Sequence, residues 1–480
     1  MVWTRHSVAH RGRPLRSSRR SPILRLPRRV AGIGFAALAS SFALSLPSTP
    51  ATATPATARA TAVGLPLSSY WEMVVESSRQ RVFLSDPTGD SVLVTDYEGQ
   101  PVAHLTGMPG ASGLALSPDS RTVYVALRDA DAIAAIDTGT LVEAARYATE
   151  GSTPVSLAPA GGKIWFGYNG DDPLAPGDIG SLDLSGAQPV LQTGQGGNWH
   201  SAPLLASAPA APDRLVAGEK NLAPASIGSY DVSTGTAQLL GKQRDFGPDG
   251  SDYLTDLAVS ADGESFVPAT DVFPETQVQV FDIDDLSFRG AYPTPARANS
   301  VDIAPDGTVA AGTYLSDGDD LHVFKPGAYA PLQSVDLDLD PSSYLPPRGV
   351  AWVPDRSRIF VVSRGADNFS LHALDGGFGT AQTALTLDAP DTSKKNRELT
   401  VTGALAPAGT FGPGTAVTVT RYDNGHPEGF PGGSVTVDDN GTFSFTDRPG
   451  EPGPVTYEVS YAGDDWHTPI SGDATVEITG

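Results

Sequence analysis

The chain has 480 residues, with 52 glycines and 41 prolines, so we expect at least two domains of a turn-rich β protein. The formal net charge is −23, and −33 without the arginine-rich residues 1–62, which argues against nucleic acid, itself negative, as a partner. The absence of cysteine excludes disulfides, thiolate zinc sites and cysteine nucleophiles.

The first 62 residues have the pattern of an export signal. A basic stretch runs to Arg29, and the apolar stretch Val30–Leu46 is short and rich in small residues, unlike a membrane span of about 20 residues. We expect residues 1–62 to be a signal peptide and processing region of a secreted or cell-surface protein, with no membrane span after removal. General secretion and twin-arginine export both stay open, and an uncleaved anchor is the alternative. Candidate A-x-A cleavage sites are Ala51-Thr52-Ala53, Ala58-Arg59-Ala60 and Ala60-Thr61-Ala62.

A turn motif recurs at a regular spacing after residue 63. Its aspartate can hydrogen-bond to its own backbone and its glycine supplies positive φ, so a tight turn forms with little strain. Successive copies lie 41 to 51 residues apart, near the period of propeller repeats. The seven copies are Thr95–Gly99, Asp137–Gly139, Asp183–Gly186, Asp231–Gly235, Phe281–Asp284, Phe324–Gly327 and Leu374–Gly376.

Residues 114–149 show the repeating unit in its clearest form. Four antiparallel strands within about 45 residues make one blade of a β-propeller. We therefore predict an all-β fold with a seven-bladed β-propeller over residues 63–390, in which the fourth blade follows the pattern least well. The expected strands of the clearest blade are Leu114–Leu116, Thr122–Leu127, Ile133–Ile136 and Leu141–Tyr147.

These turns, with strands such as Arg121–Ala126, resemble bacterial propellers of the YVTN-repeat, lactonase-like group over residues 63–390. Tyr124-Val125-Ala126-Leu127 stands where the Y-V-T-N signature would be. The resemblance implies a seven-bladed disc that is usually secreted or held at the cell surface. It does not imply a particular ligand.

A polar linker is expected at residues 391–398, and alternating short strands over 399–480 predict a β-sandwich. Tyr461–His467 resembles the Y-x-G-D-x-x-Y/W segment of bacterial Ig-like repeats, with His467 in place of the final aromatic residue. Asp438–Phe445 resembles their D-x-x-G-x-F-x-F hairpin. The resemblance implies a C-terminal Ig-like β-sandwich that serves as a spacer or adhesive unit.

The sequence contains no recognisable catalytic or cofactor motif. No histidine after the signal has another histidine within five residues, and no G-x-S-x-G elbow, P-loop or dinucleotide fingerprint occurs. A Ser-His-Asp arrangement assembled from distant blades stays open. Three acidic clusters carry the oxygen ligands that calcium prefers, although turn formation explains them as well. They are Asp171-Asp172, Asp317–Asp320 and Asp438–Asn440. We predict no catalytic residue, no metal and no cofactor.

The mouth of a propeller channel is the expected ligand site, because the loop entering each innermost strand opens there. Aligning the blades on the turn after the innermost strand places a polar and aromatic set at this entry. A shared ligand pocket would explain the set, and solvation of strand ends is the alternative. The candidates are Trp71, Ser112, Thr153, His200, Thr255, Asn299 and Arg348, with Ala202 at the aligned position of the fourth blade.

We therefore predict a secreted or cell-surface binding protein whose partner is a carbohydrate, a cell-wall polymer or another protein. The alternative is a lactonase-like hydrolase acting at the channel mouth, which converging histidine, arginine and carboxylate groups with shifted pKa would favour. A passive spacer is a third possibility, which a channel filled by apolar side chains would favour. A likeness of fold cannot separate these functions.

Overall fold

The computed structural model describes residues 59–480 except 171–175, 221, 245–252, 271–276, 315–317, 329, 376–377, 379, 413, 428–432 and 439. The expected signal peptide up to residue 58 lies outside the described residues. So do the candidate pair Asp171-Asp172, together with Asp317 and Asp439 of the other two acidic clusters. Across the described ranges, no helix combines the length and the apolar character that crossing a membrane requires.

Strands β1 to β28 form seven four-stranded antiparallel sheets within the described residues. The first three sheets contain β2 (Met73–Glu76), β3 (Arg81–Asp86), β4 (Ser91–Asp96) and β5 (Pro101–Thr106); β6 (Ala111–Leu116), β7 (Thr122–Leu127), β8 (Ala132–Asp137) and β9 (Glu143–Ala148); and β10 (Thr153–Ala160), β11 (Lys163–Asn169), β12 (Asp178–Asp183) and β13 (Val190–Gln192). A short 3-10 turn, η1 (Arg128–Ala130), joins β7 to β8.

The remaining four sheets follow the same plan, except that the last one takes its fourth strand from the other end of the chain. They contain β14 (Leu204–Ala208), β15 (Ala211–Gly218), β16 (Ser226–Asp231) and β17 (Gln238–Arg244); β18 (Leu254–Val259), β19 (Ser265–Thr270), β20 (Gln277–Asp282) and β21 (Phe288–Pro293); β22 (Ala298–Ile303), β23 (Val309–Thr313), β24 (Leu321–Phe324) and β25 (Gln333–Val335); and β26 (Val350–Trp352), β27 (Arg358–Arg364) and β28 (Phe369–Asp375) with β1 (Arg59–Leu65).

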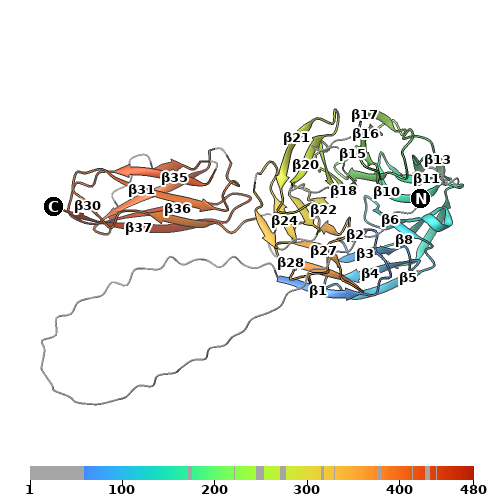
Figure 1. Ribbon diagram of the computed structural model, residues 1–480, viewed down its shortest axis with the longest axis horizontal. Coiled ribbons are helices and arrows are strands. Elements are labelled where there is room, and N and C mark those ends of the chain that lie inside the picture. The colour runs from blue at the N-terminus through green and yellow to red at the C-terminus, as the bar shows by residue number, and fades with distance from the viewer. Residues whose placement is uncertain are drawn as a thin grey trace, which may run out of the picture. The chain divides into compact units, whose positions relative to one another are not determined.

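The sheets surround a common centre, with the strands β2, β6, β10, β18 and β22 lying on its inner side (Figure 1). β2 contacts β6 on one side and β26 on the other, so the innermost strands close into a ring. Neighbouring sheets pack face to face: Phe83 and Val94 share a buried cluster with Val125 and Ile136 of the next sheet. This arrangement is a β-propeller, which confirms the predicted all-β fold and the propeller.

The predicted aspartate turns connect the strands. Asp137 Oδ1 accepts the backbone N–H groups of Gly139 and Thr140 at 3.0 and 2.7 Å, and the same Asx turn forms at Asp96, Asp183, Asp231 and Asp282. The turn after the innermost strand uses an aspartate in the same way at Asp119, Asp262, Asp306 and Asp355. Local side-chain chemistry therefore sets where each strand ends.

The N-terminal strand β1 completes the sheet built from β26 to β28. It pairs antiparallel with β28 over its whole length, from Arg59 opposite Asp375 to Leu65 opposite Phe369. Leu65 is buried in the cluster that joins this sheet to the first one, with Leu93 and Leu371. The predicted boundary between residues 62 and 63 thus falls inside a strand that closes the ring.

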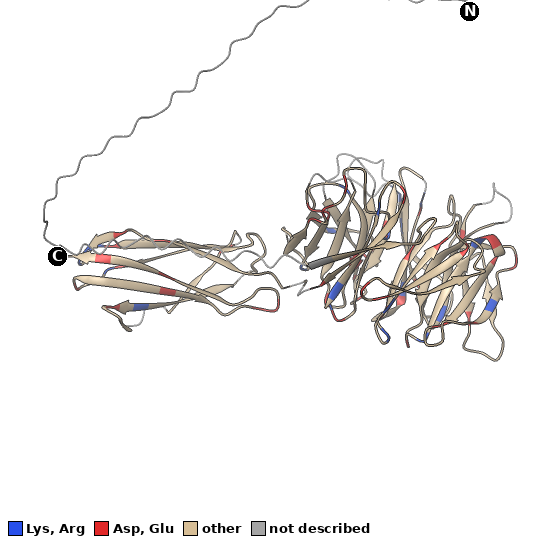
Figure 2. Cartoon of the chain, turned by 90° about the horizontal axis from the view of Figure 1, so that it is seen from below, with Lys and Arg blue, Asp and Glu red and all other residues tan. Residues whose placement is uncertain are grey.

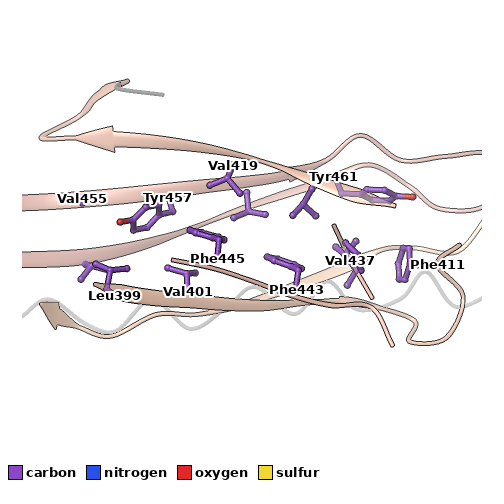
Figure 3. Packing of buried hydrophobic residues seen from close by; sticks show 14 of the residues in the cluster. Leu399, Val401, Phe411, Val419, Val437, Phe443, Phe445, Val455, Tyr457 and Tyr461 are labelled. Carbon is purple, nitrogen blue, oxygen red and sulfur yellow. The ribbon is translucent and has the colours of Figure 1, made fainter. Parts of the chain in front are cut away.

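The strands after β28 form two further sheets. One contains β29 (Ala384–Asp388), β31 (Leu399–Ala406) and β35 (Thr442–Asp447). The other contains β30 (Thr392–Lys394), β37 (Ile470–Thr479), β36 (Gly453–Tyr461), β32 (Ala416–Asp423) and β33 (His426–Pro427), with β34 (Ser434–Thr436) beside β32. Side chains of the two sheets face each other across one buried core, in which Leu399, Val401, Phe443 and Phe445 lie opposite Val419, Val455 and Tyr457 (Figure 3).

Two expectations about the C-terminal region differ from the observed pairing. Residues 384–388, expected within the propeller range, form β29 and pair with β31. Residues 391–398, expected to be a linker, contain β30, which pairs in parallel with β37. Hydrogen bonding to a neighbouring strand, which a polar sequence does not reveal, accounts for both differences.

His467 fills a buried position in this C-terminal core. It is 1% exposed and stacks on Phe411, with ring centroids 4.3 Å apart. Its Nδ1 lies 2.8 Å from Asp464 Oδ1 and its Nε2 lies 2.8 Å from Thr410 Oγ1. The imidazole therefore packs as an aromatic ring and also satisfies two polar neighbours.

We predict that removing β1 destabilises the propeller. A chain that starts at Pro66 loses every hydrogen bond between β1 and β28, each contributing about 1 kcal/mol net, and exposes the edge of β28. Its melting temperature should fall by several degrees and its tendency to associate should rise, as measured by calorimetry and light scattering. A chain that starts at Thr54 is the control, and equal melting temperatures for the two chains would contradict the prediction.

Candidate functional site

A cavity of about 450 Å³ runs along the axis of the propeller, lined by residues of the innermost strand of all seven sheets. Most of the lining is apolar, as at Leu157, Val259 and Val350. Its charged lining residues are Glu72, Asp256, Asp302 and Arg348. The axis therefore holds a space in which a few charged groups meet an apolar wall, the usual composition of a small-molecule site.

The cluster at one end of this cavity centres on Trp71, which the sequence analysis selected together with Arg348. The Nε of Arg348 donates to the backbone carbonyl of Trp71 at 2.9 Å, and its Cζ lies 4.3 Å from the indole centroid. Tyr70 Oη donates to the carbonyl of Arg348 at 2.5 Å. Arg348 adopts φ of 56°, a left-handed conformation that is uncommon for a bulky residue and often marks a functional position.

Lys220 joins the same cluster from the far side of the ring. Its Nζ lies 3.7 Å from the centroid of the Trp71 ring. Lys220 follows β15 of the fourth sheet, whereas Trp71 precedes β2 of the first sheet, three positions away around the ring. The contact therefore spans the axial mouth. No sequence motif marks Lys220, and only the closed ring brings it to Trp71.

Two donors in this cluster are buried and lack a hydrogen-bond partner among the described residues: Nε1 of Trp71 and Nη1 of Arg348. No carboxylate of the described chain lies within 4 Å of a nitrogen of Arg348. Buried donors are usually paired, so two unpaired donors side by side are a feature to be explained.

The other predicted residues lie away from the axis. Ser112, Thr255 and Asn299 are buried and donate to the backbone carbonyls of Ala126, Ala269 and Leu345. Thr153 Oγ1 donates to Asp131 at 2.9 Å. His200 is exposed, and its backbone N–H donates to Glu219; Ala202, at the aligned position, is buried.

The alternation of a β-strand explains this outcome. Successive side chains of a strand point to opposite faces, so an alignment that is one residue early, as at Thr255 and Asn299, selects side chains that turn away from the axis. The residues that follow Trp71, Thr255 and Asn299 are Glu72, Asp256 and Ser300, and these lie on the axial side. At Thr255 and Asn299 the alignment therefore selected the residue directly before the one that lies on the axial side.

These axial residues tie neighbouring sheets together. Glu72 Oε2 accepts the backbone N–H of Leu114 at 2.8 Å, and Asp256 Oδ2 accepts that of Val301 at 2.9 Å. Ser300 Oγ accepts the N–H of Val350 at 2.9 Å, and Asp302 Oδ2 accepts that of Trp352 at 2.8 Å. Each bridge satisfies a donor of the adjacent innermost strand, so the polar groups fix the register of one sheet against the next.

The electrostatic environment of the axis shifts several pKa values toward neutrality. Burial raises the pKa of Glu72 to about 7 against the opposing effect of Arg348. Burial also raises the pKa of Asp302 to about 7 and that of Asp256 above its usual range. Burial, helped by the charge of Arg348, lowers the pKa of Lys220 to about 7. The pKa values of Glu72 and Lys220 therefore both lie near neutral pH.

Histidine does not enter this site in the described part of the chain. His104, His322 and His372 each contact a serine hydroxyl, of Ser91, Ser334 and Ser363, within their own sheets. Asp464, His467 and Thr410 follow the order of an acid, a base and a hydroxyl, but His467 and Thr410 are buried in the C-terminal core. That arrangement has no space for a substrate and serves packing.

Two described aspartates of the acidic clusters accept hydrogen bonds from backbone N–H groups. Asp438 accepts the N–H groups of Asn440 and Thr442 and so shapes a turn, whereas Asp320 accepts the N–H group of Leu337, 17 residues further along the chain. Among the described residues, no group of three or more histidine, aspartate or glutamate side chains is placed to hold a metal ion. Basic and acidic residues are interspersed over the propeller (Figure 2).

Fold and site together define a β-propeller protein with an axial cavity and a cationic, aromatic cluster at one end of it. Neither the protein-family models nor the curated proteins contain a match to the chain. Among solved structures, it is similar to hydrazine synthase from Kuenenia stuttgartiensis, with a TM-score of 0.50 and 12% identity over 66% of this chain and 98% of that one. The β-propeller domain of Cps50 (Swd1) from Myceliophteria thermophila gives a TM-score of 0.49 at 12% identity, over 66% of this chain and 100% of that domain. At such identities, structural similarity concerns the fold alone.

Asp302 provides a test of the axial electrostatics. Its pKa in the folded protein is about 7, above that of an aspartate in an unfolded chain. The folded state therefore keeps the proton to higher pH than the unfolded state. As pH rises from about 4 to 7, the free energy of unfolding of the wild type falls. Asp302→Asn removes this titration. Its free energy of unfolding relative to the wild type should increase by about 2 kcal/mol from about pH 5 to about pH 8.

Denaturant unfolding at the two pH values measures this change. Asp213→Asn, at an exposed position of the same propeller, is the matched control for the replacement of a carboxylate by an amide. If the difference for Asp302→Asn is the same at both pH values, Asp302 does not titrate in the folded protein as described here.

Proposed function

We propose that the protein is a secreted or cell-surface binding protein. In this proposal, a seven-bladed propeller of the YVTN-like type binds a ligand at the axial mouth, and a C-terminal Ig-like module presents the propeller or adheres to a surface. The observation that carries the proposal is that Trp71, Lys220 and Arg348, from three different sheets, meet across the mouth of the axial cavity. Such convergence with buried, unpaired donors is typical of a recognition site.

The propeller supports this role because Trp71, Lys220 and Arg348 each lie two residues from the end of a strand. The bridges from Glu72, Asp256 and Ser300 fix adjacent innermost strands, so a bound ligand would meet a preorganised surface. The partners we propose are a carbohydrate, a cell-wall polymer or a protein that presents a small group to the mouth.

Export is proposed from the N-terminal sequence, with its basic stretch, its apolar stretch and its A-x-A sites. The Ig-like module is proposed from the two motif segments, whose residues have consistent roles. Phe443 and Phe445 are buried in the core, Asp438 and Gly441 shape the hairpin, and Tyr461 donates to Asp464.

A second function, a hydrolase acting at the same mouth, is favoured by one observation. Glu72 has a pKa of about 7 and lies beside Arg348 and Lys220, so it can serve as a general base at neutral pH. The described residues that line the cavity include no histidine or other recognised nucleophile in contact with Glu72. Binding is therefore the function that the geometry supports best.

We expect a ligand of this site to raise the melting temperature, and to raise it further as its concentration increases above its dissociation constant, because it binds the folded state only. The purified protein from Thr54 is screened by calorimetry against neutral and acidic glycans, wall fragments and lactones. Trp71→Leu should abolish a shift that arises at the mouth, whereas the matched Trp466→Leu, in the C-terminal region, should retain it.

A shift that survives in Trp71→Leu would place binding elsewhere and contradict the proposed site. Hydrolysis of a lactone by the wild type, lost in Glu72→Gln, would replace the binding function by the hydrolase.

Cleavage of the proposed signal should leave β1 intact, because β1 is the fourth strand of the last sheet. Cleavage after Ala53 retains all of β1, whereas cleavage after Ala62 removes four of its seven residues. We therefore expect the exported protein to begin at Thr54, as measured by intact mass and N-terminal sequencing. A mature protein that begins at Val63 would contradict this prediction.

A further inference from the structure

We infer that the axial mouth recognises a carboxylate group of its ligand, held between Arg348, Trp71 and Lys220. This inference rests on the proposed binding function and narrows it to a chemical class. The carboxylate can belong to a small sugar acid or to an acidic unit of a glycan, because both present the same planar, two-oxygen anion.

The donors fit a planar anion with two acceptor atoms. Nη1 of Arg348 is a buried guanidinium N–H without a partner, and Nε1 of Trp71 is a buried indole N–H without a partner among the described residues. The guanidinium lies over the indole ring, with its Cζ 4.3 Å from the ring centroid, so the two donors belong to one cluster. An arginine fork binds carboxylates through charge-assisted hydrogen bonds, which are roughly twice as strong as neutral ones.

Lys220 adds a second positive charge on the other side of the mouth. Its ammonium group lies 3.7 Å from the indole centroid. An anion at the mouth would be attracted by both Arg348 and Lys220, at a site whose apolar wall reduces screening. Both cations lie close to the Trp71 ring, so the site offers the ligand charge and N–H groups in preference to an open aromatic face.

The neighbouring acids are compatible with an anionic ligand. Asp256 accepts hydrogen bonds from Leu257, Ser300 and Val301, so its oxygens are already engaged. Among the described residues, the carboxyl group of Glu72 is hydrogen-bonded only to the backbone N–H of Leu114, through Oε2. Protonated Glu72 can therefore donate to a carboxylate instead of repelling it.

This arrangement makes binding depend on pH. The groups that face Glu72 and Lys220 are Tyr70, Arg128, Asp256 and Arg348. As pH rises through about 7, Glu72 gains a negative charge and Lys220 loses its positive charge, and both changes weaken an anion's binding. Tyr70 stays neutral because burial raises its pKa well above the usual range.

Isothermal titration with glucuronate tests the inference, with glucose as the uncharged match and with oligogalacturonate to separate a free acid from a polymer unit. We expect glucuronate to bind at least about tenfold more tightly than glucose, and about tenfold more tightly at about pH 6 than at about pH 8. Arg348→Gln and, separately, Lys220→Gln should each weaken glucuronate binding about tenfold or more. Arg146→Gln, on β9 at the outer rim, is the matched control and should bind like the wild type.

Tighter binding of the oligomer than of the monomer would identify a glycan unit as the source of the carboxylate, and equal binding would identify a free acid. Glucuronate binding no tighter than glucose, or unchanged in both variants, would overturn the inference. Inorganic phosphate binding more tightly than glucuronate would also overturn it. If a neutral ligand still raises the melting temperature and Trp71→Leu abolishes that rise, the binding function holds without carboxylate recognition. If no compound raises the melting temperature of the wild type, the binding function and the carboxylate inference are both contradicted.

Discussion

The two faces of each propeller sheet are buried, because neighbouring sheets pack against both of them around the axis. This constraint requires that the ring close, since an open ring would leave one sheet face in water. Strand β1 is part of that closure: it pairs with β28 and buries Leu65 beside Leu93 of the first sheet. The N-terminal and C-terminal ends of the repeat therefore stabilise each other, and positions at the axis are fixed by all seven sheets together.

Closure also determines what polar groups at the axis must do. The innermost strands run side by side without a regular ladder between sheets, so their backbone donors need other partners. Glu72, Asp256, Ser300 and Asp302 supply them across each interface. Burying carboxylates for this purpose costs free energy and raises their pKa values, which is why groups that stabilise the ring also titrate near neutral pH.

The same closure forms the candidate site. Trp71 and Arg348 enter it from neighbouring sheets, and Lys220 reaches it from across the ring. Trp71 Nε1 and Arg348 Nη1 have no hydrogen-bond partner among the described residues. By contrast, Asp256 accepts the N–H group of Val301, and Arg358 pairs with Asp375. A propeller fold hosts many functions, so this cluster of buried, unpaired donors, and not the fold, supports binding.

The sequence by itself determined the local features: strands, turns and the spacing of the repeat. These depend on alternating apolar residues and on aspartates such as Asp137 that bond to their own backbone, which are interactions between residues close in sequence. The tertiary structure alone decided the rest. It showed that β1 belongs to the last sheet, that Glu72 and Asp256 line the axial cavity, and that Lys220 meets Trp71. Strand pairing between distant segments and the facing of a side chain depend on register, and a one-residue error in register reverses the face without changing the pattern.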